Sequence, residues 1–291
     1  MMNRVLITLA RKLRMLGRLP KGPTLILLVL IVSAVFADFL ALYDPEFGDP
    51  RKRLLPPFWE ERGTISYPLG TDTMGRDILS RLIYGSRISL LVALSAVVFA
   101  ACLGTAVGLL AGYFGGWVDQ IIMRLTDAWL SIPIVMFGML VAVILGPGVF
   151  NIIIILSIVF WTRYARVVRS ETLSLKTRDF VHLAVIAGCG HFRIIRKHIL
   201  PNVVNNVITL ASLQIGVAVV LEASLTFLAV GVPPPKPAWG LMLSEGREGL
   251  MAGYWWLVIF PGAAIALLVM SFNLLGDWLR LQLDPHYRNL K

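Results

Sequence analysis

No charged side chain interrupts residues 88–118, ISLLVALSAVVFAACLGTAVGLLAGYFGGWV. Four more charge-free runs lie at 22–37, 128–162, 203–221 and 249–276. A helix that crosses a bilayer needs about 20 apolar residues, and one soluble core cannot bury five such runs. The chain has 291 residues, of which 57% are hydrophobic and 15% charged, whereas a soluble domain carries about 25% charged residues. The sequence therefore predicts an all-α integral membrane protein.

The hydrophobic runs predict about six transmembrane helices. We expect them at 23–43, 88–112, 119–145, 149–168, 203–228 and 254–276. The run at 128–162 is too long for one crossing, and Gly146-Pro147-Gly148 divides it, because Gly and Pro disfavour helix continuation. Residues 44–87 then connect the first two helices, and residues 88–276 form a core of five helices that includes a polar connection at 171–202.

Charge indicates the orientation of these helices rather than binding to nucleic acid, although the net charge is +10. Residues 1–22 carry six basic side chains and no acidic one, and residues 163–198 carry eight basic against two acidic. Residues 44–87 balance seven against seven. The positive-inside rule therefore predicts that both terminal tails, 1–22 and 277–291, lie in the cytoplasm with the 171–202 connection, and that 44–87 lies outside.

Motifs for nucleotide, metal or acyl chemistry are missing from the sequence. It has no Gly-x-x-x-x-Gly-Lys-Ser/Thr loop, no Gly-x-Gly-x-x-Gly or Gly-x-Ser-x-Gly motif and no Cys/His cluster. We therefore expect no enzyme activity, no metal and no cofactor in this chain.

Two acidic residues near predicted helix ends, Asp127 and Glu222, are candidates for a transport pathway or gate, because an ionisable residue inside a membrane indicates function. The structural alternative is a local partner, and Asp127 lies three residues after Arg124, with which it can pair on a helix. Small residues at four-residue spacing predict close helix packing, within the chain in preference to a dimer seam. These are Gly104, Gly108 and Gly112.

The connection between the fourth and fifth helices carries most of the functional information. It predicts two short helices, 179–187 and 192–200, which Gly188-Cys189-Gly190 separates. The second has an apolar stripe and a basic stripe, and such a helix pair can lie at a membrane surface and offer a face to a soluble partner. We interpret it as a docking element in preference to a plain connecting loop. The residues that we assign to it are Asp179, Phe180, His182, Ala184, Gly188, Gly190, Leu200 and Pro201.

This connection resembles the cytoplasmic loop of ABC importer permeases, in which Glu-Ala-Ala, three residues, Gly, nine residues and Ile-x-Leu-Pro follow one another. Ala184, Gly188, Leu200 and Pro201 match the pattern. His182 stands in place of the Glu, Leu183 in place of the first Ala and His198 in place of the Ile. The stretches 68–90, 221–243 and 255–285 are similar to the permeases of dipeptide, oligopeptide and nickel importers, in the order found in the second of their two paired permeases.

The resemblance implies a type I ABC importer permease bundle with a cytoplasmic coupling loop, in a bacterial cytoplasmic membrane. It also implies three kinds of protein partner besides the lipid bilayer, and no nucleic acid. They are a second homologous permease, two ATPase subunits that bind the ATP, and an extracytoplasmic substrate-binding protein. Peptides are the expected substrate, with nickel, glutathione and oligosaccharides as alternatives. An ion-coupled secondary transporter is the alternative from another class, and it predicts inverted repeats and charged sites at mid-membrane.

Overall fold

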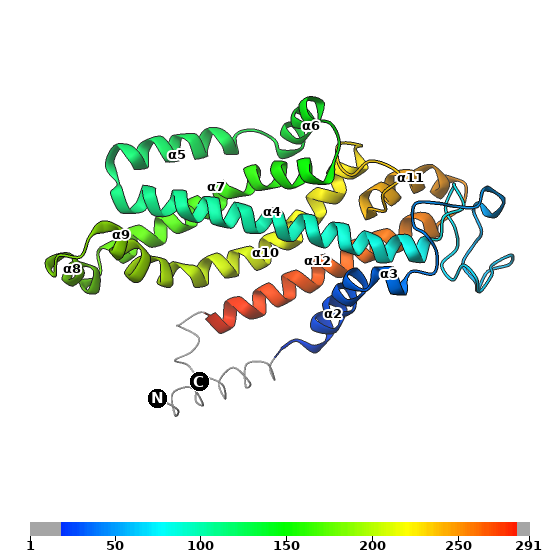
Figure 1. Ribbon diagram of the computed structural model, residues 1–291, viewed down its shortest axis with the longest axis horizontal. Coiled ribbons are helices and arrows are strands. Elements are labelled where there is room, and N and C mark those ends of the chain that lie inside the picture. The colour runs from blue at the N-terminus through cyan, green and yellow to red at the C-terminus, as the bar shows by residue number, and fades with distance from the viewer. Residues whose placement is uncertain (1–18, 284–291) are drawn as a thin grey trace.

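The computed structural model describes residues 19–283, which are helical over most of their length (Figure 1). The α-helices are α2 (Lys21–Val35), α3 (Ala37–Leu40), α4 (Ile78–Phe114), α5 (Gly116–Leu130), α6 (Ile134–Leu145), α7 (Val149–Lys176), α8 (Asp179–Ile186), α9 (His191–Ile194), α10 (Leu200–Phe227), α11 (Trp239–Met251) and α12 (Trp256–Leu283). A 3-10 turn, Pro50–Lys52, and a π turn, Ile195–Ile199, complete the helical elements of this part. The predicted tails 1–22 and 277–291 fall largely outside the described residues.

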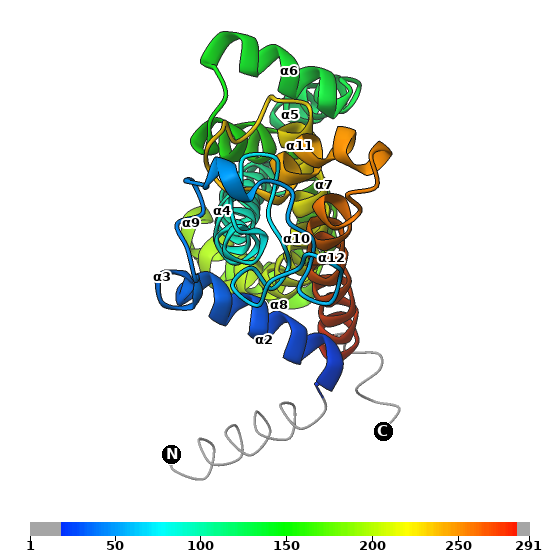
Figure 2. The same ribbon diagram turned by 90° about the vertical axis from the view of Figure 1, so that its right-hand side faces the viewer.

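Four long helices, α4, α7, α10 and α12, run side by side along the molecule (Figure 1). One end of the bundle carries α8 and α9, and the other carries residues 41–77 and α11, which face the viewer in Figure 2. Four helical stretches are long and apolar enough to cross a membrane, and a bent pair, α5 with α6, would make a fifth. The all-α membrane fold is confirmed, but the described residues do not contain six full-length spans.

The first predicted helix, 23–43, is interrupted. Helix α2 ends at Val35 and only the short α3 follows. The Arg87 guanidinium explains this end, because its Nε donates to the Ala34 carbonyl at 2.8 Å and its Nη2 pairs with Asp38 at 3.0 Å. Carbonyl groups at the end of a helix need such outside donors, so Arg87 stabilises the helix end where hydropathy predicts continuation.

The second helix begins earlier than the predicted residue 88. Asp77 caps α4, since its Oδ2 accepts from the Ser80 N–H at 2.8 Å and from the Ser80 hydroxyl at 2.6 Å. Residues 78–87, assigned from the sequence to the connection 44–87, are therefore helical. Hydropathy excluded them because they contain Arg81 and Arg87, but Arg81 is fully buried and ion-paired.

The predicted third helix, 119–145, is wrong as a single element. It breaks at residues 131–133, where α5 and α6 meet with a bend of 89°. Pro133 is the cause, because it lacks the N–H that a continuing helix needs and it disfavours helical geometry at Ile132. The predicted break at Gly146-Pro147-Gly148 is confirmed, since α6 ends at Leu145 and α7 begins at Val149.

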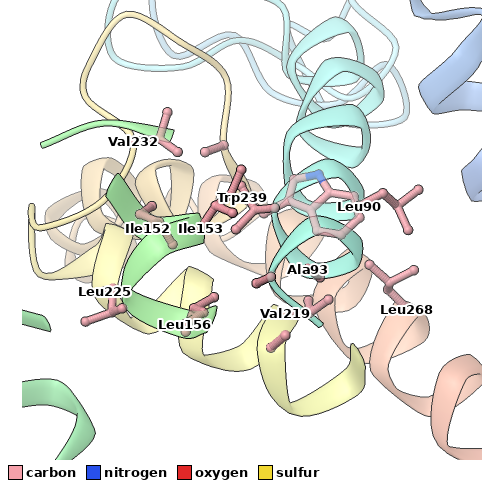
Figure 3. Close-up of a cluster of buried hydrophobic side chains, with 14 of the residues drawn as sticks. Leu90, Ala93, Ile152, Ile153, Leu156, Val219, Leu225, Val232, Trp239 and Leu268 are labelled. Carbon is pink, nitrogen blue, oxygen red and sulfur yellow. The ribbon is translucent and has the colours of Figure 1, made fainter. Parts of the chain in front are cut away.

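Helix α11 lies within residues 229–253, where the sequence predicted no helix. Its first residue, Trp239, is completely buried among the long helices (Figure 3). The indole Nε1 donates to the Leu82 carbonyl at 3.0 Å, and Gly85 leaves room for the ring, because a Cβ there would lie 2.5 Å from it. A large aromatic side chain with its N–H satisfied is a strong anchor, so Trp239 fixes α11 to α4.

Candidate coupling segment

Residues 177–199 join α7 to α10, and we refer to them as the coupling segment. Helix α8 ends where the sequence predicts it, at Gly188, whose φ of +73° is in the left-handed region that glycine adopts most easily. The Gly188 N–H donates to the Val185 carbonyl at 2.9 Å, and the Cys189 N–H to the Ala184 carbonyl at 3.0 Å. These bonds are those of a glycine C-cap, and they turn the chain back towards the bundle.

The two sides of α8 have different surroundings. Val181 and Ala184 are buried on the inner side, in a cluster with Ile194 and Ile199 of the following turns. The outer side leaves apolar side chains exposed, and we call this set the α8 outer face. It consists of Leu183 (64% exposed), Val185 (55%), Ile186 (81%) and, from α9, Phe192 (74%). Packing thus fixes the helix from within and leaves an apolar surface uncovered.

Contacts with the ends of α4 and α7 hold the coupling segment in place. The Tyr113 hydroxyl lies 2.8 Å from Nδ1 of His191. Lys176, the last residue of α7, donates from Nζ to the Tyr113 carbonyl at 2.7 Å. Tyr113 was not predicted as a functional residue because it lies inside the charge-free run 88–118. Its signal is a lone tyrosine at the end of an apolar helix, where a hydroxyl can reach a polar partner.

The second predicted helix of this segment, 192–200, is not separate from the fifth span. Helix α9, the π turn and α10 form one continuous helical stretch from His191 to Phe227. Pro201 lies in the first turn of α10, two residues before the predicted start of the fifth span, and it has no N–H to bond to a preceding carbonyl. The π turn immediately before it lets the backbone pass this position without ending the helix.

Six of the eight residues assigned to docking lie in α8 and the turn that follows it, whereas Leu200 and Pro201 begin α10. Ala184 is buried and Leu200 is half-buried. The others are exposed: Asp179, Phe180, His182, Gly188, Gly190 and Pro201. Neither Gly188 nor Gly190 has a neighbour within 4 Å of where a Cβ would lie, so a partner could approach the backbone closely there.

The glycines at four-residue spacing all lie against α7. A Cβ on Gly108 would lie 2.6 Å from the Ala165 carbonyl oxygen, and one on Gly112 would lie 2.7 Å from Cβ of Thr172. Gly104 similarly faces the Trp161 carbonyl. This is the close packing within the chain that the spacing predicts.

The two candidate pathway acids lie in different surroundings. Asp127 is exposed on α5 and pairs with Arg166 of α7 at 2.5 Å, so the expected pairing with Arg124 is wrong. Glu222 is completely buried in α10, where it accepts hydrogen bonds from Ser89 at 2.9 Å and Thr226 at 3.0 Å. Its partners are hydroxyl groups inside the bundle rather than a loop or headgroup, and a role in the pathway stays a prediction for both acids.

Residues 104–289 match the family described as "Binding-protein-dependent transport system inner membrane component". Among its relatives, the dipeptide transport system permease protein DppC of Haemophilus influenzae is 42% identical over 264 residues, 91% of this chain and 89% of that protein. The di/tripeptide transport system permease protein DppC of Pseudomonas aeruginosa is 40% identical over 92% of this chain and 88% of its own length. The chain belongs to this family of permeases.

Solved structures support the same fold. The permease is similar to a chain of the inward-facing MetNI methionine ABC transporter, with a TM-score of 0.57 and 19% identity over 70% of this chain and 96% of that chain. It is also similar to a chain of an amino acid ABC transporter, with a TM-score of 0.52 and 15% identity over 72% and 94%. The predicted type I importer permease bundle and the function as the permease of an ABC importer are confirmed.

Family membership also separates the permease from the other class that the sequence left open. It is the inner membrane component of an ABC importer that depends on a binding protein, not an ion-coupled carrier. The transport system to which it contributes therefore includes an ATPase and a binding protein. In such a system the permease must respond to its ATPase, and contact through the coupling segment stays a prediction from its sequence pattern.

Proposed function

We propose that this permease is one of two different permease subunits in a bacterial peptide importer and that its coupling segment docks onto a cytoplasmic ATPase. The α8 outer face is the observation that carries the docking. Ile186 and Phe192 are among the most exposed apolar side chains of the described chain, although they lie between the end of α7 and the charge-free run at 203–221. An apolar helix face of this kind fits a groove on a partner.

The charge pattern supports the orientation that this docking requires. Basic residues exceed acidic ones in the N-terminal tail and around the coupling segment, whereas residues 44–87 are balanced. By the positive-inside rule we place the coupling segment and both termini in the cytoplasm, and residues 41–77 with α11 outside. ATP is then bound by the partner subunits, and the permease itself holds no cofactor.

A second permease would cover the apolar surface of α5. Three side chains on this helix remain widely exposed, Trp117 at 80%, Ile121 at 56% and Leu125 at 54%. Together with Gln120, Arg124 and Ala128 they form an open surface on one side of the helix. One bundle forms only one wall of a pathway, so we propose that a second, homologous permease packs here and completes it.

Peptides are the substrate class that the relatives favour, since dipeptide and di/tripeptide permeases are 42% and 40% identical to this chain. A glutathione transport system permease of Pectobacterium atrosepticum is 39% identical over 91% of this chain, and glutathione is itself a tripeptide. Uptake of labelled dipeptide, tripeptide and glutathione into vesicles that contain the complete transporter tests this proposal. Transport of nickel or an oligosaccharide without any peptide would overturn it.

Docking is tested by placing a charge on the α8 outer face. Ile186→Asp should leave the permease in the membrane and reduce the amount of ATPase that co-purifies with it, because a buried unpaired carboxylate opposes the contact. Ile65→Asp is the matched control, since Ile65 is 86% exposed but belongs to residues 41–77, which lie at the opposite end of the molecule from α8 (Figure 1). Equal recovery of ATPase with both variants would contradict the docking assignment.

A further inference from the structure

Four charged side chains, three of them buried and Glu245 partly exposed, form a cluster at the α11 end, far from the coupling segment. Arg76 and Arg81 are each only 1% exposed. Arg76 pairs with Asp72 at 2.6 Å and with Glu245 at 2.8 Å. Arg81 also pairs with both acids, and its bond to Glu245 measures 2.8 Å. Two positive charges thus meet two negative charges in one closed set, which we call the outer clamp.

The outer clamp joins the segment before α4 and the start of α4 to α11, which is distant from both in sequence. Asp72 and Arg76 belong to the segment before α4, Arg81 to the first turns of α4, and Glu245 to the middle of α11. Burial raises the pKa of Asp72, but the Arg81 and Arg76 charges and two backbone N–H groups outweigh it, so its pKa is below the usual value. The two guanidinium groups thus favour the ionised form of Asp72, and losing a partner from this set would leave an uncompensated buried charge.

Helix α11 has two attachments to α4. Trp239 lies against Gly85 and donates to the Leu82 carbonyl. Glu245, almost two turns further along α11, reaches Arg81 on the same helix. Two attachment points on a rigid helix prevent rotation about either one, so α11 must follow the outer end of α4.

Helix α4 reaches from this clamp to the coupling segment. It has 37 residues, which at 1.5 Å per residue gives about 55 Å. Tyr113, near its other end, contacts His191 and Lys176. Between the two ends Gly104 and Gly108 lie directly on the backbone of α7, where close contact leaves little freedom for sliding. Helix α4 is thus connected at both ends, and neither connection uses a flexible loop.

We propose that Arg81 and Glu245 are positioning residues for transport, which fasten α11 to α4 so that a displacement of the coupling segment reaches the opposite end of the permease through α4. The proposal rests on the docking of an ATPase at the coupling segment. It identifies α11 as the part of the outer end that moves during the ATPase cycle. It also gives Glu245 a role that Glu248, an exposed acid on the same helix, does not share.

The first test uses the complete transporter in proteoliposomes, with its ATPases, second permease and binding protein. Glu245→Gln keeps the size of the side chain but removes its charge. We expect normal assembly and basal ATP hydrolysis, with about tenfold less substrate transported per ATP. Glu248→Gln should change none of these.

A normal amount of substrate transported per ATP in Glu245→Gln would overturn the proposal. A decrease in transport that is fully explained by a smaller amount of assembled transporter would also overturn it. A second measurement uses spin labels at Glu248 on α11 and Leu91 on α4, both exposed, after replacement of Cys102 and Cys189. The distance between them should stay constant between nucleotide-free and vanadate-trapped transporter. A changed distance would refute the clamp, whereas failure of ATPase docking would appear separately, in the Ile186→Asp experiment.

Discussion

Close packing of α4 on α7 makes Gly108 sensitive to a single methyl group. In Gly108→Ala the new Cβ would lie 2.6 Å from the Ala165 carbonyl oxygen, 2.9 Å from Cβ of Val168 and 3.1 Å from Cα of Ala165. Two of these three atoms belong to the backbone, so no rotamer change relieves the contact and the helices must separate. Overpacking of this kind costs about 1–3 kcal/mol, against about 1 kcal/mol gained from the better helix propensity of alanine.

Gly262 of α12 is the matched control, since it also lies within a membrane helix. A Cβ there would meet only Cδ2 of Leu243, at 3.9 Å, which is ordinary van der Waals contact. We expect Gly108→Ala to lower the apparent Tm of the detergent-solubilised permease and Gly262→Ala to leave it unchanged or raise it. Thermal unfolding followed by size-exclusion chromatography measures both. An unchanged or higher Tm for Gly108→Ala would refute the close packing of α4 and α7.

Three other outcomes are expected. Gly188→Ala should lower the free energy of unfolding by about 1 kcal/mol, because φ is +73° at Gly188. It should also reduce ATPase recovery more than Gly190→Ala does, since Gly190 has an ordinary φ of −65°. Equal effects of the two substitutions would contradict the C-cap role of Gly188. Asp127 and Arg166 are both widely exposed, so a double-mutant cycle measured by thermal or denaturant unfolding should give a coupling free energy below about 1 kcal/mol. A larger coupling free energy would show that the pair is shielded from water. Because the folded-state pKa of Asp72 is lowered from 3.8, its contribution to stability is complete above that value and is lost as pH falls through the lower folded-state pKa. The Asp72→Asn variant should therefore lose less stability than the unmodified permease when the pH falls below about 4. The same dependence of stability on pH in both proteins would argue against an ionised Asp72.

Hydropathy and turn chemistry predicted the parts of the fold in which one signal dominates. The charge-free run at 88–118 contains most of α4, and Gly146-Pro147-Gly148 separates α6 from α7. The coupling segment was recognisable because Gly188 ends a helix, and helix ends of this kind have a local cause. In each case the residues that decide the structure are neighbours in sequence.

The missed features depend on contacts between distant parts of the chain. Helix α11 is short and of mixed polarity, and it is fixed by the fit of Trp239 against Gly85, which no local pattern reveals. The bend between α5 and α6 did have a local signal, Pro133, but the surrounding apolar residues outweighed it in the prediction. The ion pair of Asp127 also depends on a contact between distant parts of the chain, because its partner Arg166 lies in α7 and not in the same helix as Asp127.

Charged residues near the outer end of the bundle explain why the ends of the spans were misplaced. A hydropathy argument treats each arginine as a residue that belongs in water, yet Arg81 is 1% exposed and Arg87 bonds to the end of α2. Guanidinium groups can do this because each has five donors in a fixed plane and stays ionised when buried. Two of these donors on Arg87 bind the carbonyls of Ala34 and Val35, and Nη1 of Arg81 reaches both acids of the clamp. Arg81 and Arg87 therefore extend α4 beyond its apolar run and connect it to α11 and α2, so the residues that hid the start of the helix also connect it to its neighbours.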